Sequence, residues 1–168
     1  MKNITFIGMS GAGKSTIGKL LAEQCNFDFF DIDKLIEDES GTSLPELIEK
    51  IGDEVFIEKE ASIVLSLKFM NNNGTVVSPG GSIIYSSAGM NFLKKNSKVI
   101  YLDTPIEEIK KRMESFDRKK RLIKLADRSI DELIEERRHL YKKYADLTIM
   151  TENKTIEDII NEIKANFC

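Results

Sequence analysis

The chain has 168 residues, 41% of them hydrophobic and 32% charged, and this is typical of a soluble globular protein that folds as a single domain, here residues 1–168. A formal net charge of −3 argues against nucleic acid as the main partner, two cysteines are too few for a disulfide framework, and no apolar stretch reaches the length of a membrane span. We therefore expect a cytoplasmic protein that binds neither nucleic acid nor a membrane. We also expect a monomer, although composition alone does not set the oligomeric state.

Short apolar runs that are typical of strands alternate with stretches of helical periodicity along the chain. The expected strands are residues 4–7, 27–30, 75–78, 98–102 and 147–150. The expected helices are residues 14–25, 35–39, 52–69, 131–144 and 156–165, with one more that opens at a Ser43–Glu46 capping box and one that ends near residue 113. This alternation predicts an α/β fold with three layers, α/β/α, around a five-stranded parallel sheet. In such sheets, ligands bind beyond the carboxyl ends of the strands.

A glycine-rich loop follows the first expected strand, and residues 8–15, Gly-Met-Ser-Gly-Ala-Gly-Lys-Ser, match the phosphate-loop pattern G-x-x-x-x-G-K-[ST]. Glycines allow backbone N–H groups to surround phosphate oxygens, and the helix that begins near Lys14 adds the positive end of its dipole. We expect Lys14 to reach the β- and γ-phosphates of ATP and act in catalysis, and Ser15 to ligate Mg²⁺. The alternative is a turn without a ligand, but a chance match in this chain is on the order of one in a few hundred. The expected ATP-binding residues of the loop are Gly11, Ala12, Gly13, Lys14, Ser15 and Thr16.

Two carboxylates, Asp31 and Asp33, follow the second expected strand. On an extended backbone, residues two apart point to the same side, so we expect both to face the mouth of the phosphate site. A kinase for an alcohol needs one carboxylate that orients the hydroxyl and accepts its proton, and a second carboxylate can hold water bound to Mg²⁺. The alternative is structural, because either aspartate could cap the helix that follows.

Residues 115–128 are rich in arginine and lysine and show no clear periodicity. One interpretation is a solvated surface loop. The other is a mobile lid, about residues 115–130, that brings Lys120 or Arg121 over the transferring phosphoryl group and excludes water when it closes. We favour the lid, and we expect Lys120 and Arg121 to contact ATP.

These motifs, in this order, resemble the shikimate kinase family, which belongs to the nucleoside-monophosphate-kinase-like P-loop proteins. The resemblance extends over nearly the whole chain and is carried by residues 8–22, 30–43, 52–60, 79–81 and 136–146. It implies a kinase that uses ATP and Mg²⁺ to phosphorylate the 3-hydroxyl of shikimate, a step in aromatic amino-acid (chorismate) biosynthesis. It also implies that substrate-binding helices lie within about residues 33–70.

The resemblance implies a role for single positions of this chain. Asp33 would hold the reacting hydroxyl and act as the base, and Asp31 would lie near Mg²⁺ and contact it through water. Gly80 and Gly81 would contact the substrate, and Arg137 would grip its carboxylate.

Arg112 matches the family residue that lies near the adenine of ATP, but four other features depart from the family, one of them His139 in place of a proline. Ile57 stands where the family has an arginine, half of a two-arginine clamp on the shikimate carboxylate, and an aliphatic side chain cannot replace a bidentate charged contact. Pro79 replaces the first glycine of the family's triplet. The lid arginine is either displaced to Arg121 or replaced by Lys120.

Ile57 leaves a second acceptor open. The chain could be a shikimate-kinase-like enzyme that phosphorylates a different small hydroxy acid or hydroxy amino acid. Lys59 is a weak substitute for the missing arginine, because residues two apart do not share a helix face. A remote alternative is a nucleotide-dependent regulatory module without an acceptor.

Overall fold

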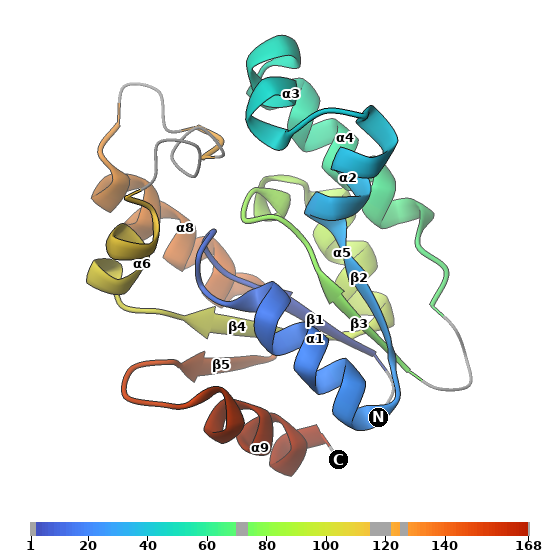
Figure 1. The fold of residues 1–168 in the computed structure, drawn as a ribbon, viewed down its shortest axis with the longest axis vertical. Helices are drawn as coiled ribbons and strands as arrows, with labels where there is room; N and C mark the ends of the chain where they lie inside the picture. The colour runs from blue at the N-terminus through green and yellow to red at the C-terminus, as the bar shows by residue number, and fades with distance from the viewer. Residues whose placement is uncertain (1–2, 70–73, 115–121, 125–127, 168) are drawn as a thin grey trace.

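The computed structural model describes residues 3–69, 74–114, 122–124 and 128–167, and at its centre lies a parallel sheet (Figure 1). The strands are β1 (Asn3–Ile7), β2 (Asp28–Asp31), β3 (Thr75–Ser78), β4 (Lys98–Asp103) and β5 (Leu147–Met150). Their order in the sheet is β2-β3-β1-β4-β5, and every neighbouring pair is parallel. The predicted five-stranded parallel sheet is confirmed, with each strand end within one residue of its expected position.

Helices cover both faces of the sheet, as the alternating pattern predicts. α1 (Lys14–Cys25) and α9 (Ile156–Phe167) lie on one face, and α5 (Ser87–Asn96) and α8 (Ile130–Tyr144) lie on the other (Figure 1). The remaining helical elements are α2 (Ile32–Ser40), α3 (Leu44–Ile51), α4 (Asp53–Ser66), the short 3-10 helix η1 (Ile83–Tyr85) and α6 (Ile106–Arg112). α2, α3 and α4 pack against one another above the carboxyl end of β2 (Figure 1).

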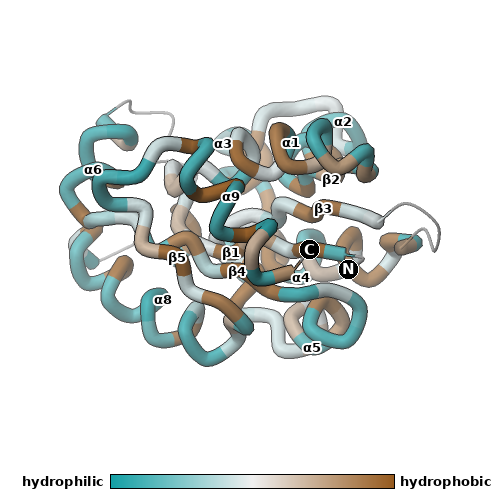
Figure 2. Tube along the Cα trace, turned by 90° about the horizontal axis from the view of Figure 1, so that it is seen from below, coloured by the Kyte–Doolittle hydropathy of each residue, from teal (hydrophilic) through white to brown (hydrophobic). Residues whose placement is uncertain are grey.

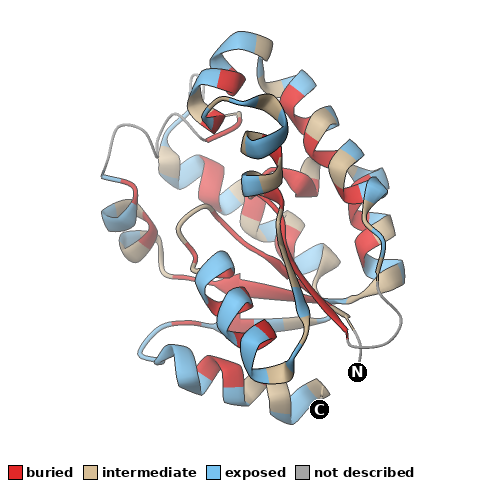
Figure 3. Ribbon diagram, turned by 45° about the vertical axis from the view of Figure 1, so that its right-hand side comes forward, coloured by how far each residue is buried: buried red, intermediate tan, exposed pale blue. Residues whose placement is uncertain are grey.

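Side chains of the strands alternate between two hydrophobic cores. Ile4 and Phe6 of β1 pack with α1 and α9, whereas Ile7 packs with α4, α5 and α8 on the opposite face. Val76 and Val77 of β3 divide between the two cores in the same way, because successive strand residues point to opposite faces. The inner strands β1, β3 and β4 are consequently mostly buried on both sides (Figure 3), whereas the edge strands β2 and β5 are partly exposed. The outward turns of α6 and α8 are mostly hydrophilic (Figure 2).

Local residue preferences explain where the helices that follow β2 begin and end. α2 ends at Gly41, which has φ +68, a left-handed conformation that glycine adopts without strain. The predicted capping box is confirmed, because the Ser43 N–H donates to Glu46 Oε2 at 3.3 Å at the start of α3. α4 ends at Ser66, three residues earlier than expected, because Leu67 is already extended.

The structure contains two elements, η1 and α5, that the sequence pattern does not predict. Gly89 lies inside α5, and glycine disfavours helix interiors. A Cβ at Gly89 would lie 2.9 Å from Ile83 Cδ1, so a larger residue here would require the Ile83 side chain to shift. The Ser86 Oγ that accepts the Gly89 N–H at 3.1 Å is the local signal for the start of this helix.

The expected lid lies mostly outside the described residues, and so do Lys120 and Arg121. The part of this region that the structure describes, residues 122–124, carries the buried side chains of Leu122 and Ile123. In the described ranges, no helix combines the length and apolar character that crossing a membrane requires.

Candidate functional site

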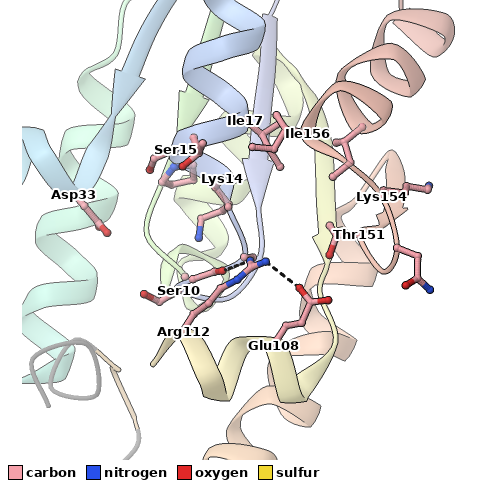
Figure 4. A pocket seen from close by; sticks show the side chains of 18 residues that line it. Ser10, Lys14, Ser15, Ile17, Asp33, Glu108, Arg112, Thr151, Lys154 and Ile156 are labelled. Carbon is pink, nitrogen blue, oxygen red and sulfur yellow. Dashed lines mark hydrogen bonds and ion pairs between the residues drawn. The ribbon is translucent and has the colours of Figure 1, made fainter. Parts of the chain in front are cut away.

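A cavity of about 730 Å³ opens at the carboxyl end of the sheet, around the glycine-rich loop (Figure 4). Nine of the residues expected to form the site line it, namely Gly11, Ala12, Gly13, Lys14, Ser15, Thr16, Asp33, Gly81 and Arg112. Three others, Asp31, Gly80 and Arg137, are not part of its lining. The fold therefore brings the two sequence motifs, the phosphate loop and the acidic segment, to one cavity.

The loop between β1 and α1 is built to receive an anion. Gly11 and Gly13 have φ values of +83 and +93, which residues with a Cβ rarely adopt. Gly13 is the N-cap of α1 and provides no side-chain cap, and no acidic residue lies in the first turn. The N-terminal N–H groups and the positive end of the helix dipole are thus left to a ligand such as phosphate.

Lys14 lies folded against the loop and is only 7% exposed. Its Nζ donates hydrogen bonds to the carbonyl oxygens of Gly8 and Met9, both at 2.9 Å. Burial lowers the pKa of Lys14 from its usual value, while the nearby carboxylates, chiefly Asp33 and Glu60, oppose that shift. The amine therefore presents a cation at the floor of the phosphate loop, where phosphate oxygens would replace the loop carbonyls as partners.

Three residues with oxygen-bearing side chains lie where β2 and β3 end and α1 begins. The register of the parallel strands places Asp31 opposite Ser78, and Ser78 Oγ lies 3.2 Å from Ser15 Oγ. Oxygen ligands of this kind suit Mg²⁺, so the residues fit the expected ion. No group of three or more His, Cys, Asp or Glu side chains in the described part of the chain is placed to hold a metal. Mg²⁺ would accordingly complete its shell with phosphate oxygens and water, as it usually does in ATP sites.

The expectation that Asp31 and Asp33 share one side of an extended strand is wrong. β2 ends at Asp31, and α2 begins at the next residue. The capping alternative is confirmed for Asp31, whose Oδ1 accepts the Lys34 N–H at 3.3 Å. Asp33 lies in the first turn of α2 and still lines the cavity, because the helix turns its side chain toward the phosphate loop (Figure 4).

Arg112, at the end of α6, closes the opposite side of the loop. Its Nη1 donates to the Gly11 carbonyl at 2.7 Å, and its Nη2 pairs with Glu108 at 2.9 Å (Figure 4). The segment between β5 and α9 lines the same end of the cavity with Thr151, Asn153 and Lys154, and the first residue of α9, Ile156, joins them. The sequence pattern does not indicate these four residues, because they are remote from every motif and reach the site only through the sheet order.

Arg137 of α8 is buried, with 1% exposure. Its Nη2 donates to the Ile123 carbonyl at 2.5 Å, and its Nε donates to the Tyr85 hydroxyl at 3.4 Å. Among the residues that the structure describes, no carboxylate lies within ion-pair distance of this guanidinium. A buried cation with neutral partners only is suited to receive an anion from outside the chain.

The absence of side chains at Gly80 and Gly81 lets charged groups approach the end of β3. A Cβ at Gly80 would lie 2.6 Å from Glu60 Oε1 and 2.7 Å from Asp33 Oδ1. A Cβ at Gly81 would lie 3.0 Å from Arg137 Nη1. Gly80 and Arg137 therefore belong to a second region, which joins the phosphate cavity at Asp33 and Gly81.

Glu60 of α4 is one of the residues that carry the family resemblance, but the sequence predicts no role for it in the site. It is 0% exposed, and its Oε2 accepts the Ser82 hydroxyl at 2.6 Å, while Oε1 has no hydrogen-bond partner among the described residues. Burial raises the pKa of Glu60 to about 7, and the negative charge of Asp33 adds to this effect. A carboxyl that is half-protonated near neutral pH thus lies beside Asp33 at Gly80.

We expect Glu60→Gln to flatten the pH dependence of the free energy of unfolding. The pKa of Glu60 in the folded protein is about 7, above the ordinary value of 4.5, so the folded state binds this proton more tightly than the unfolded chain. The stability that this group contributes is fully present below its unfolded pKa and is lost as the pH rises through about 7, by about 3 kcal/mol in total. Glutamine stays neutral, so the unfolding free energy of the variant should fall much less with rising pH than that of the wild type.

Urea denaturation between about pH 5 and 8 measures the effect. The matched control is Glu58→Gln, because Glu58 is exposed on the same helix. Equal slopes of unfolding free energy against pH in the wild type and Glu60→Gln would show that Glu60 does not titrate in this range.

The position of Ile57 agrees with its apolar chemistry. Its side chain is 7% exposed and belongs to the core that α4, α5 and α8 share. Lys59 does not replace the missing arginine, since its Nζ pairs with Glu39 Oε1 at 3.0 Å. The helix therefore offers no cation at position 57 or 59 to a ligand near Arg137.

Comparisons with known proteins agree on one family. The family model described as shikimate kinase matches residues 10–167. The chain is 38% identical over 163 residues to the shikimate kinase of Sulfurihydrogenibium sp., covering 97% of this chain and 96% of that protein. It is 39% identical over 163 residues to the shikimate kinase of Persephonella marina, covering 97% of both chains.

Solved structures give the same result. The shikimate kinase of Acinetobacter baumannii in complex with shikimate superposes with a TM-score of 0.86 at 30% identity, covering 99% of this chain and 92% of that chain. A gluconokinase of Sinorhizobium meliloti matches with a TM-score of 0.58 at 16% identity, covering 98% of this chain and 90% of that chain, and this likeness concerns the fold alone.

Proposed function

The chain belongs to the shikimate kinase family, and we propose that it transfers the γ-phosphoryl group of ATP to the 3-hydroxyl of shikimate. The observation that carries the proposal is that Asp33 lines the same cavity as Lys14 and the phosphate loop. A carboxylate next to a phosphate site is what transfer to an alcohol requires. Family membership supports shikimate as that alcohol.

The donor side of the reaction is assigned to the phosphate loop. The N–H groups of residues 11–16 and the start of α1 bind the phosphates of ATP. Lys14 exchanges its loop carbonyls for β- and γ-phosphate oxygens and offsets the charge that develops during transfer. Arg112 lies at the side of the cavity where the residues before α9 leave room for the adenine. Lys120 and Arg121 are proposed as lid residues that contact the same phosphates.

Ser15, Ser78 and Asp31 are the residues that would hold Mg²⁺, with Asp31 acting through water. The ion neutralises phosphate charge and polarises the γ-phosphoryl group when it is bound. The two serine hydroxyl oxygens are 3.2 Å apart, so they lie close enough together to contact one ion.

The acceptor side is assigned to Asp33, Gly80, Gly81 and Arg137. Asp33 orients the 3-hydroxyl and accepts its proton. The hydroxyl oxygen then forms a bond to the γ-phosphorus, and the bond from that phosphorus to the β–γ bridging oxygen breaks, which leaves ADP. Arg137 binds the carboxylate of the acceptor, because it is a buried guanidinium with neutral partners among the described residues.

ADP release measured with a panel of acceptors tests the proposal. Shikimate should give turnover well above the rate without acceptor, whereas gluconate, quinate and homoserine should not. Turnover that is highest with a different hydroxy acid or hydroxy amino acid would assign the chain to the alternative that Ile57 leaves open. ADP release that no acceptor increases would contradict a small-molecule kinase altogether.

A further inference from the structure

Lys124 brings a second cation to the Tyr85 ring that Arg137 also contacts. Its Nζ lies 4.5 Å from the centroid of the Tyr85 ring, and the guanidinium carbon of Arg137 lies 5.4 Å from the same centroid. The Tyr85 hydroxyl also accepts the Arg137 Nε–H, and Ile123, the residue before Lys124, accepts the Nη2–H. The two cations therefore contact the same aromatic side chain, although they come from different segments.

The backbone of Lys124 is held in an unusual conformation. Its φ is +62, in the left-handed region that costs free energy for a residue with a Cβ. The Lys124 N–H donates to Asp53 Oδ2 at 2.6 Å, and this bond fixes the residue against the start of α4. A strained residue that is tied to a neighbouring helix indicates a constraint on where its side chain points.

The amine of Lys124 lies over the turn of α4 that precedes Ile57. It pairs with Glu54 Oε1 at 3.5 Å, and Glu54 and Asp53 come three and four residues before Ile57, on the same helix face. Side chains on a helix lean toward its N-terminus, so a long side chain at position 57 would extend over this turn. Lys124 thus places positive charge in the region that a cation at position 57 would reach.

We propose that Lys124 and Arg137 together bind the carboxylate of the acceptor, and that Lys124 supplies the positive charge that Ile57 cannot. This inference rests on the proposed function, because it takes a carboxylated alcohol as the acceptor. Two cations on different sides of a carboxylate fix both its position and its orientation. Glu54 is 81% exposed, so its ion pair with Lys124 is weak and the acceptor carboxylate can compete for the amine.

Steady-state kinetics of Lys124→Met give the first test. The KM for shikimate should rise about 10-fold, while kcat and the KM for ATP should change less than about twofold, because only the bound carboxylate loses a charge-assisted contact. Lys124→Arg, which keeps the charge, should restore most of the affinity. Lys59→Met is the matched control, since Lys59 is a lysine of α4 whose amine pairs with Glu39 instead.

Glu54→Gln gives a second test with the opposite sign. Removal of the competing carboxylate should free Lys124 and lower the KM for shikimate by about two- to threefold. If Lys124 only held its segment against α4, Glu54→Gln would leave the KM for shikimate unchanged or raise it. A fall in this KM therefore separates recognition of the acceptor from a structural role.

Calorimetric titration with shikimate and with its methyl ester, which lacks the negative charge, completes the test. Lys124→Met should weaken binding of shikimate and leave binding of the ester unchanged. If the wild type phosphorylates shikimate and Lys124→Met has the same KM and the same Kd, the inference is overturned and the proposed function stands. If the wild type neither binds nor phosphorylates shikimate, both are overturned.

Discussion

Replacing Asp33 with asparagine is expected to lower kcat for shikimate phosphorylation by about 10²- to 10⁴-fold and to leave the Kd for ATP near its wild-type value. Asp33 lines the phosphate cavity, and its Oδ1 lies against Gly80 at the end of β3. Asparagine keeps the shape of the side chain but cannot take the proton of the acceptor hydroxyl. Steady-state ADP release and calorimetric titration with ATP measure the two effects separately.

Asp38→Asn is the matched control for this prediction, because Asp38 is an exposed aspartate on the same helix. It should leave both kcat and the Kd for ATP unchanged. A regulatory module that only binds nucleotide would be indifferent to Asp33→Asn, so retained activity in that variant would contradict the assignment of Asp33 as the base.

Lys14→Met is expected to lower kcat by about 10²- to 10³-fold and to weaken ATP binding as well. The buried Lys14 amine is the cation at the floor of the phosphate loop, and it is held there by the carbonyls of Gly8 and Met9. Methionine has a similar length but donates no hydrogen bond and has no charge to offset the developing charge on the phosphoryl group. Single-turnover rates at saturating ATP isolate the effect on the chemical step.

The Lys14 amine also donates hydrogen bonds to two loop carbonyls, so its replacement affects stability as well as catalysis. The thermal unfolding of Lys14→Met therefore has to be measured together with its activity. Lys19→Met serves as the control, since Lys19 is exposed on α1. A folded Lys14→Met protein with wild-type kcat would remove this lysine from the mechanism.

Local sequence signals predict most of the fold and the donor half of the site. The phosphate loop requires only consecutive residues, so residues 8–16 identify it before any contact is known. Strand positions also follow from local pattern, because the parallel sheet is buried on both faces. The stop of α2 at Gly41 and the capping box at Ser43 are local as well.

The acceptor half depends on contacts between residues that are far apart in the sequence, and there the sequence is less informative. Glu60 meets Asp33 only across Gly80, and Ser78 meets Ser15 only because β3 lies beside β1. Asp33 illustrates a different limit. Asp33 lines the cavity, as the motif predicts, and its role as the base stays a prediction. The strand geometry used to place it is wrong, because the chain turns into α2 directly after Asp31.

Lys124 could not be found from the sequence, because a single lysine within a basic stretch has no distinguishing pattern. Its significance depends on its contacts with Tyr85 and Glu54 from two other elements. The absence of an arginine at position 57 is evident from the sequence, whereas the group that we propose as its replacement is found only through its contacts in the fold.

Identification of the product tests the central claim most directly. The protein should be incubated with ATP, Mg²⁺ and shikimate, and the products should be quantified by phosphorus NMR. We predict one equivalent of ADP for each equivalent of shikimate phosphorylated, with the phosphate on the 3-hydroxyl. ADP formed without phosphorylated shikimate, or at the same rate when shikimate is omitted, would contradict the assignment.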